Sequence, residues 1–309
     1  MLDIFLKTLP FFAIIGLGYG AGRRGFFTAE ATAYLTKFVF YFALSAMLFR
    51  FSANLSFWRV FDGQVVLAYL AATTAIYLLA TAVAFSRRIG VEQAAIESQC
   101  AVIGNVGFLG VPMLTLLLGE AAIGPVMLIL ATDLIVFGSL VVILITGGRG
   151  GRGVGTVLAT VGRGLIANPM IVSIVLGFGW AALEWPIPAP MNEFLAILGG
   201  AATPGALFAI GASLANKSAE RLSIAGWLSF CKLVLHPAAV ALTSLIVFTV
   251  DRYTAGVMIS AAALPVAGNV YMIAQHYGVA PQRVSASILI STAVSVLTVS
   301  LVIGLVQGG

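Results

Sequence analysis

Long runs of apolar residues alternate with short polar segments along the whole chain. The runs are continuous and do not alternate with a period of two, so they indicate helices and not barrel strands. Each run is about 20 residues long, which is the length that a helix needs to cross a bilayer. The runs lie near residues 4–22, 29–49, 63–85, 93–118, 121–147, 164–183, 191–215, 224–250, 255–278 and 282–307. We therefore predict an all-α polytopic membrane protein with ten transmembrane helices.

The composition strengthens this prediction. The residue types AVILMFWYC make up 61% of the 309 residues, and charged residues make up 9%, against about 25% in an ordinary soluble protein. The lipid bilayer is therefore the expected partner. A nucleic-acid partner is not expected, although the net charge is +5, because no basic patch is interleaved with aromatic residues. With two histidines, two cysteines and no HExxH pattern, neither an enzyme nor a metal site or other cofactor is expected.

The distribution of lysine and arginine predicts the orientation. One set of loops carries Arg23, Arg24, Arg87, Arg88, Arg149, Arg152, Arg163, Lys217, Arg221 and Arg283, whereas the opposite set carries Lys7, Arg50, Arg59 and Arg252. The richer side is expected to face the cytoplasm. Both termini then lie on the non-cytoplasmic side of the cell (inner) membrane.

The two halves of the chain share a repeat. Pro10 precedes Gly18-Tyr19-Gly20 by the same spacing with which Pro169 precedes Gly177-Phe178-Gly179, and Phe49 matches Phe208 at the same offset. Because helix 1 has this partner, we do not interpret residues 1–22 as a cleaved signal segment. Five spans per half is an odd number, so the repeat should be inverted, as in many secondary transporters. The expected organisation is a first repeat at 1–147, a cytoplasmic connecting loop at 148–163 and a second repeat at 164–309.

Helices 4 and 9 carry interruptions at corresponding places. Three glycines and a proline fall within nine residues of helix 4, and Pro265 precedes Gly268 in helix 9. Such residues weaken a helix interior by about 1 kcal/mol for glycine and 3 kcal/mol for proline. A mid-membrane break is tolerated where it lines a cavity, and its helix ends can bind ions or anionic groups. The candidate substrate- or ion-binding residues are Gly104, Asn105, Gly107, Pro112, Pro265, Gly268 and Asn269.

The segment Gly104–Pro112, GNVGFLGVP, resembles helix 4 of the auxin efflux carrier family. Leu264–Gly278, LPVAGNVYMIAQHYG, and Pro204–Ala215, PGALFAIGASLA, resemble its helices 9 and 7. The resemblance implies two inverted five-helix repeats with crossing helices 4 and 9, a fold similar to that of sodium/proton antiporters and bile-acid symporters. It also implies a scaffold of helices 1, 2, 6 and 7 beside a moving domain of helices 3–5 and 8–10.

The resemblance implies transport of an organic anion. Plant members export auxin, and many bacterial relatives are assigned to dicarboxylates such as malate or malonate. Ser45 and Gly104 stand where family members often have proline, and the central loop is short. These departures disfavour auxin itself as the substrate.

Ionisable residues inside a membrane are functional candidates. Asp133 lies near the middle of helix 5, and Lys232 and His236 share one face of helix 8. Asp133 either pairs with Lys232 or titrates during transport. Glu97 precedes the break in helix 4, where it could face an ion path, although a solvated interfacial acid is the favoured interpretation. His276 follows the break in helix 9 and is expected near the outer end of its span.

The sequence therefore predicts a secondary carrier of a small organic anion, a carboxylate, that works by alternating access of the elevator type. Coupling to protons or sodium is open, as is a homodimeric state. The alternatives are a cation/proton antiporter, which the asparagines at the predicted crossover disfavour, and a membrane receptor or sensor.

Overall fold

The computed structural model describes residues 2–55, 61–148, 154–215 and 222–308. The first half comprises α1 (Leu2–Arg23), α2 (Ala29–Phe38), η1 (Val39–Ala43), α3 (Leu44–Ala53), α5 (Gly63–Ser86), α6 (Val91–Val102), η2 (Val106–Gly110), α7 (Val111–Leu118), η3 (Glu120–Ala122), α8 (Ile123–Thr132), η4 (Asp133–Phe137) and α9 (Gly138–Gly148). The second half comprises α10 (Val154–Ala167), α11 (Pro169–Ala182), α12 (Ala189–Gly200), α13 (Ala202–Leu214), α14 (Leu222–Phe230), η5 (Cys231–Leu235), α15 (His236–Leu242), η6 (Thr243–Val247), α16 (Arg252–Ala262), α17 (Gly268–Tyr277) and α18 (Pro281–Gly308).

The predicted all-helical class is confirmed for the described residues, and the apolar runs coincide with helices. Six continuous helical segments are long and apolar enough to cross a membrane, namely Ala29–Ala53, Gly63–Ser86, Glu120–Gly148, Ala189–Leu214, Leu222–Val247 and Pro281–Val306. The bent pair of α10 and α11 adds a seventh if it counts as one span. The chain is thus a multi-pass membrane protein.

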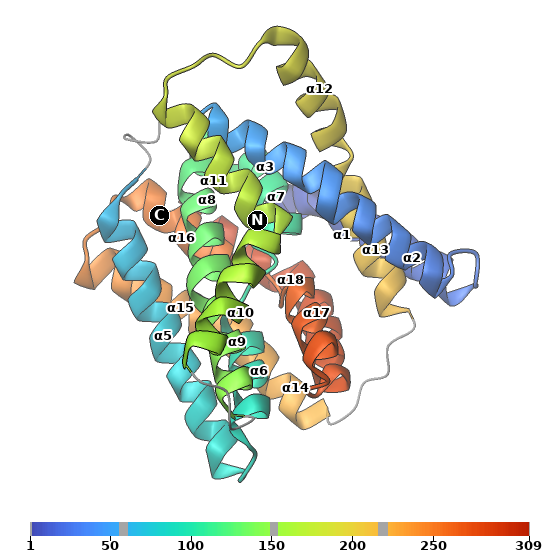
Figure 1. Ribbon diagram of the computed structural model, residues 1–309, viewed down its shortest axis with the longest axis vertical. Coiled ribbons are helices and arrows are strands. Elements are labelled where there is room, and N and C mark those ends of the chain that lie inside the picture. The colour runs from blue at the N-terminus through green and yellow to red at the C-terminus, as the bar shows by residue number, and fades with distance from the viewer. Residues whose placement is uncertain (1, 56–60, 149–153, 216–221, 309) are drawn as a thin grey trace.

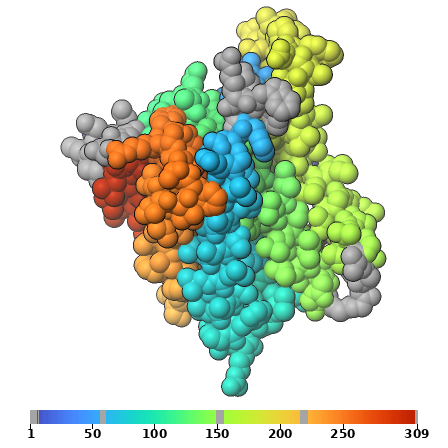
Figure 2. Space-filling model, turned by 90° about the vertical axis from the view of Figure 1, so that its left-hand side faces the viewer, coloured from blue at the N-terminus to red at the C-terminus, as the bar shows by residue number. Residues whose placement is uncertain are grey.

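Large apolar side chains cover much of the outer surface. On α5 alone, Leu67, Leu78 and Leu79 are each exposed by more than two fifths. Figure 2 shows this helix as a cyan column along one face, with an orange segment of the second half on one side and green segments on the other. Lipid chains would solvate such a surface, whereas water would not.

One predicted boundary is wrong. The connecting loop expected at 148–163 is helical from Val154 onward, and α10 then meets α11 at an angle of 71°. Val154, Leu158, Val161 and Leu165 recur at spacings of three and four residues, which is the pattern of an apolar helix face. Five of the basic residues used for the orientation, Arg59, Arg149, Arg152, Lys217 and Arg221, lie outside the described residues.

The helices pack in two groups. In one, α1 packs along α13, and α3 packs against α11 and α12. Figure 1 shows the blue helices of this group crossing the upper part of the molecule. In the other group α5 packs on α6, α14 on α18, and α15 on α16. The hydroxyls of Thr8 on α1 and Ser300 on α18 lie 2.8 Å apart, in a hydrogen bond between the groups.

The repeat seen in the sequence recurs in the packing. A Cβ added at Gly18 of α1 would overlap the carbonyl oxygen of Phe208 on α13. A Cβ added at Gly177 of α11 would lie 2.8 Å from the carbonyl oxygen of Phe49 on α3. Both glycines therefore permit the same close helix approach, with the corresponding residue of the other half as partner.

Replacing Gly18 by alanine is expected to lower the stability of the folded protein by about 1–3 kcal/mol, because overpacking forces two helix backbones apart. Gly20→Ala is the matched control, because a Cβ at Gly20 meets open space. Thermal unfolding of both purified variants in the same detergent measures the difference. Equal unfolding temperatures would contradict the contact.

Candidate functional site

The interruptions between α6 and η2 and between α16 and α17 meet inside the protein. The N–H of Asn105 donates to the carbonyl of Pro265 at 2.8 Å, and the N–H of Ala267 donates to the carbonyl of Ile103 at 3.1 Å. These two bonds form an antiparallel bridge between short extended stretches. The bridge satisfies backbone groups that the breaks remove from the helices.

Local sequence explains where the breaks fall. Pro265 lacks an N–H and cannot continue the ladder of α16, but its carbonyl serves the bridge. At Gly104 a Cβ would lie 3.2 Å from Nζ of Lys232 and 3.3 Å from the carbonyl oxygen of Ala261, so a larger residue would crowd the crossing. Pro112 lies away from the bridge, near the first residue of α7, where the helix continues through it.

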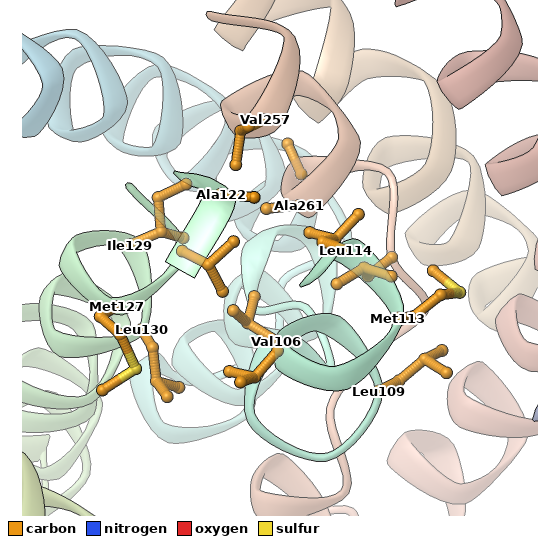
Figure 3. Close-up of a cluster of buried hydrophobic side chains, with 14 of the residues drawn as sticks. Val106, Leu109, Met113, Leu114, Ala122, Met127, Ile129, Leu130, Val257 and Ala261 are labelled. Atoms are coloured by element: carbon orange, nitrogen blue, oxygen red, sulfur yellow. The ribbon is translucent and has the colours of Figure 1, made fainter. Parts of the chain in front are cut away.

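Packing fixes the second half of the broken helix 4. Val106, Leu109, Met113 and Leu114 of η2 and α7 are all buried. Figure 3 shows them in one cluster with apolar side chains from α8 and α16, including Ile129, Leu130, Val257 and Ala261. The crossing is therefore held on one side by a rigid apolar core.

Helix ends of opposite polarity surround the crossing. α6 and α16 end there, and the C-terminal end of a helix is partly negative. The segment that begins with η2 and the helix α17 start there, with partly positive N-termini. Gly107 lies close to Met170 of α11, and a Cβ at Gly268 would meet open space. The arrangement can bind a cation at one pole and an anion at the other.

The two asparagines carry buried oxygens without partners. Oδ1 of Asn105 and Oδ1 of Asn269 accept no hydrogen bond within the described protein. Two further buried oxygens nearby, Oε1 of Gln99 and Oδ2 of Asp133, also lack a partner. Unsatisfied buried polar atoms are costly and call for an explanation. A bound ligand that carries donors would provide one.

Three of these four residues line a cavity of about 340 Å³. The walls come from η1, α6, η4, α9, α10, α11 and α17, and they include Gln99, Asp133, Asn168, Met170, Asn269, His276 and Tyr277. The cavity therefore extends from the crossing, at Asn269, along one face of α17. It lies between the two groups of helices, because α11 and η1 on one side belong to the group of α1.

Asp133 is buried at the start of the π-helical segment η4. Its Oδ1 accepts a hydrogen bond of 2.9 Å from the hydroxyl of Tyr69. No ion pair joins Asp133 to Lys232 among the described residues, so the structure does not contain the first of the two alternatives for Asp133. Helix packing places the amine of Lys232 at a main-chain carbonyl instead.

Lys232 is fully buried on η5, and its amine donates to the carbonyl of Ala262, the last residue of α16. Nζ lies 3.3 Å from Nδ1 of His236, one turn further along. Nε2 of the same ring lies 3.0 Å from the hydroxyl of Thr73 on α5. The predicted shared face of Lys232 and His236 is therefore present, and it points at the crossing.

Glu97 is not a solvated interfacial acid. Its side chain is 1% exposed and forms ion pairs with Arg87, at the end of α5, and with Arg283, near the start of α18. The second Arg87 contact, from Nη1 to Oε1, measures 3.4 Å. Three segments thus meet at one carboxylate, and the loops that carry these two arginines lie at the same end of the molecule, as the charge distribution predicts.

Some site residues were misplaced or missed by sequence reasoning. His276 lies in the last turn of α17, toward the end that carries Arg283, whose loop the charge distribution assigns to the cytoplasm and not to the outside. Tyr69 and Thr73 lie on α5 in an uninterrupted apolar run and carry no charge, so nothing in the sequence marks them. Asn168 caps α11 by accepting from the N–H of Met170 at 3.0 Å, and the Asn-Pro pair was a usable signal for this break.

Comparison with known proteins agrees with this geometry. The profile of a family described as "Membrane transport protein" matches residues 3–303. The chain is 32% identical over 312 residues to a protein of Rhizobium meliloti (strain 1021) named "Putative malonate transporter", covering 100% of this chain and 98% of the relative. It is 25% identical to the "Uncharacterized transporter YfdV" of Escherichia coli (strain K12), covering 97% of each chain. The chain therefore belongs to the membrane transport protein family, the auxin efflux carrier family that its helix 4, 7 and 9 motifs resemble, and it is a transporter, not an enzyme.

Proposed function

We propose that the protein is a secondary transporter that carries a small organic anion, a carboxylate, across the cell membrane by alternating access. The observation that supports this most strongly is the cavity that ends at two crossing broken helices, with the amide group of Asn269 and the carboxyl group of Asp133 at its wall. Broken helices that meet in this way are the usual substrate sites of secondary transporters.

The proposed topology is ten spans in two inverted repeats, with both termini outside and the cytoplasm at the Arg87 end. The reciprocal contacts of Gly18 and Gly177 support the repeat, and the meeting of Arg87 and Arg283 at Glu97 supports the common end of their loops. The cavity wall runs along α17 toward that same end, which supports an inward-facing state under the proposed topology.

The proposed substrate class is a small mono- or dicarboxylate, with malonate as the first compound to test. A relative named as a malonate transporter supports this choice. A volume of about 340 Å³ is at the small end of ligand pockets. Among the described lining residues there is no lysine or arginine, so the positive N-terminus of α17 and the amide groups of Gln99 and Asn269 would receive the carboxylate.

Asp133, which lines the same cavity, is proposed to carry a coupled proton. An ionised Asp133 would repel an incoming anion and leave Oδ2 buried without a partner. A protonated Asp133 would instead donate from Oδ2 to the substrate. The titratable or charged groups near it are Tyr69, Lys232 and, across the cavity, His276.

The motion is proposed to be of the elevator type. The group of helices that includes α5, α6, α16 and α18 carries the crossing, while the group of α1, α3, α11 and α13 remains as the scaffold. The contacts between the groups include small residues, as at Gly107 against Met170. Small residues at such an interface permit close sliding contact.

A cation/proton antiporter is the second candidate, because the cavity contains an acid and no basic residue other than His276 among its described walls. Transport measurements separate the two. An antiporter would move sodium or potassium against a pH gradient without any carboxylate, whereas the proposed carrier would move radiolabelled carboxylate.

Asn269→Ala is expected to weaken carboxylate binding about tenfold, because one hydrogen bond to a charged group contributes about 1.5–3 kcal/mol. Thermal-shift titration of purified protein with malonate, malate and acetate measures binding, and proteoliposome uptake measures flux. Asn54→Ala is the control: it lies on an exposed turn and bonds its own helix end. Unchanged binding and uptake in Asn269→Ala would refute the assigned site.

A further inference from the structure

A buried amine occupies the negative pole of the crossing. Lys232 is 0% exposed, and its Nζ donates to the carbonyl of Ala262. That carbonyl belongs to the last turn of the broken helix α16, where main-chain oxygens have no helical N–H to accept from. In transporters of this architecture, such carbonyl ends are where a coupling cation is coordinated.

The position of the amine is specified by three elements. Pro237, two residues after η5, removes a main-chain donor, which explains the π-helical turn that turns Lys232 inward. His236 holds Nζ from one side and is itself held by Thr73 of α5. At Gly104 the missing side chain leaves the space that Cε and Nζ fill.

The positive charge of Lys232 is stabilised by the partly negative C-terminal end of α16. Negative helix ends attract a cation with an energy of about 0.3–1 kcal/mol at exposed sites and up to about 2 kcal/mol when partly buried. Asp133 is the acidic residue in the neighbourhood of Lys232, but it lies too far away for an ion pair. The ammonium therefore has the main-chain carbonyl as its nearest negative partner, as a bound inorganic cation would.

We infer that the Lys232 ammonium is a built-in substitute for a coupling sodium ion at the carbonyl end of α16, so that transport by this protein does not require sodium. The uptake measurements that test this inference rest on the proposed transport function, whereas the stability measurements do not. The ammonium offsets the partly negative end of α16, and the partly positive N-terminus of α17 stays available to the anion.

Wild-type uptake and unfolding temperature are expected to be the same in sodium and in choline buffers. Lys232→Ala is expected to lose at least about tenfold in uptake, because a hydrogen bond from a charged group is removed. The alanine leaves a space beside the carbonyl, so sodium or methylammonium should raise the unfolding temperature of this variant and restore part of its uptake. Lys232→Met fills the space without charge, so neither ion should rescue it.

Lys37→Ala is the control, because this lysine lies exposed on α2 over the ring of Tyr34. Sodium-dependent uptake by the wild type, or wild-type uptake and stability in Lys232→Met, would overturn the inference while leaving the transport function intact. Cations could restore the stability of Lys232→Ala while the protein transports no carboxylate. That result would support the inference and contradict the proposed function. If Lys232→Ala does not fold, the sodium test on the wild type decides.

Discussion

Glu97→Gln is expected to destabilise the folded protein by about 3–5 kcal/mol, the loss typical when one partner of a buried ion pair is removed. The reason is not the attraction alone. Arg283 is only 10% exposed, so loss of the carboxylate leaves a guanidinium buried without a counter-charge. Arg87 is 29% exposed and can turn toward solvent, so most of the loss should come from Arg283. Thermal or denaturant unfolding in detergent measures the effect.

A double variant tests this explanation. Glu97→Gln combined with Arg283→Gln removes both charges, so it is expected to be more stable than Glu97→Gln alone. Glu120→Gln, at an exposed carboxylate, is the control and should change stability by no more than about 0.5 kcal/mol. If Glu97→Gln unfolds like the wild type, the three-segment ion cluster does not hold the fold.

Asp133→Asn is expected to abolish proton-driven accumulation of the carboxylate. With the membrane potential held at zero, a gradient of one pH unit can sustain an about tenfold gradient of a substrate carried with one proton, since a factor of ten corresponds to about 1.4 kcal/mol. Asparagine keeps the shape and an oxygen for the Tyr69 hydroxyl, but it cannot release a proton. Accumulation should fall from about tenfold to none, while counterflow of labelled substrate persists.

Asp62→Asn serves as the matched control. Asp62 is exposed and caps α5 by accepting from the N–H of Gln64 at 2.8 Å, a bond that asparagine can also accept. Accumulation in this variant should equal that of the wild type. Wild-type accumulation in Asp133→Asn would show that the proton travels elsewhere, with His276 as the next residue to replace.

The features that the sequence predicts well are those with local causes. Apolar runs predict the helices, and the Gly-Pro clusters around Gly104 and Pro265 predict that helices 4 and 9 are broken, because both residue types weaken a helix wherever it lies. The depth of Asp133 and Lys232 follows from their places within the runs. Each of these inferences needs only neighbouring residues.

The features that it does not predict depend on residues far apart in the chain. The second partner of Glu97, Arg283, comes from the opposite half of the sequence, so the acid resembled an interfacial one. The partner of Lys232 is a main-chain carbonyl, which any residue carries, so no side-chain pattern could reveal it. The helix that begins at Val154 was obscured by the glycines and arginines that precede it.

The bridge between Asn105 and Pro265 has a consequence for the origin of this architecture. Each half of the chain supplies one extended stretch, and the two main-chain hydrogen bonds of the bridge run from one half to the other. If the halves arose by duplication, the ancestral half-length chain could complete the crossing only by pairing with a second copy inserted in the opposite direction. Such a precursor would have been a dual-topology dimer, whose orientation could not have been biased strongly by its loop charges. The unequal distribution of arginine and lysine in the present chain would then postdate the fusion, when one fixed orientation became possible.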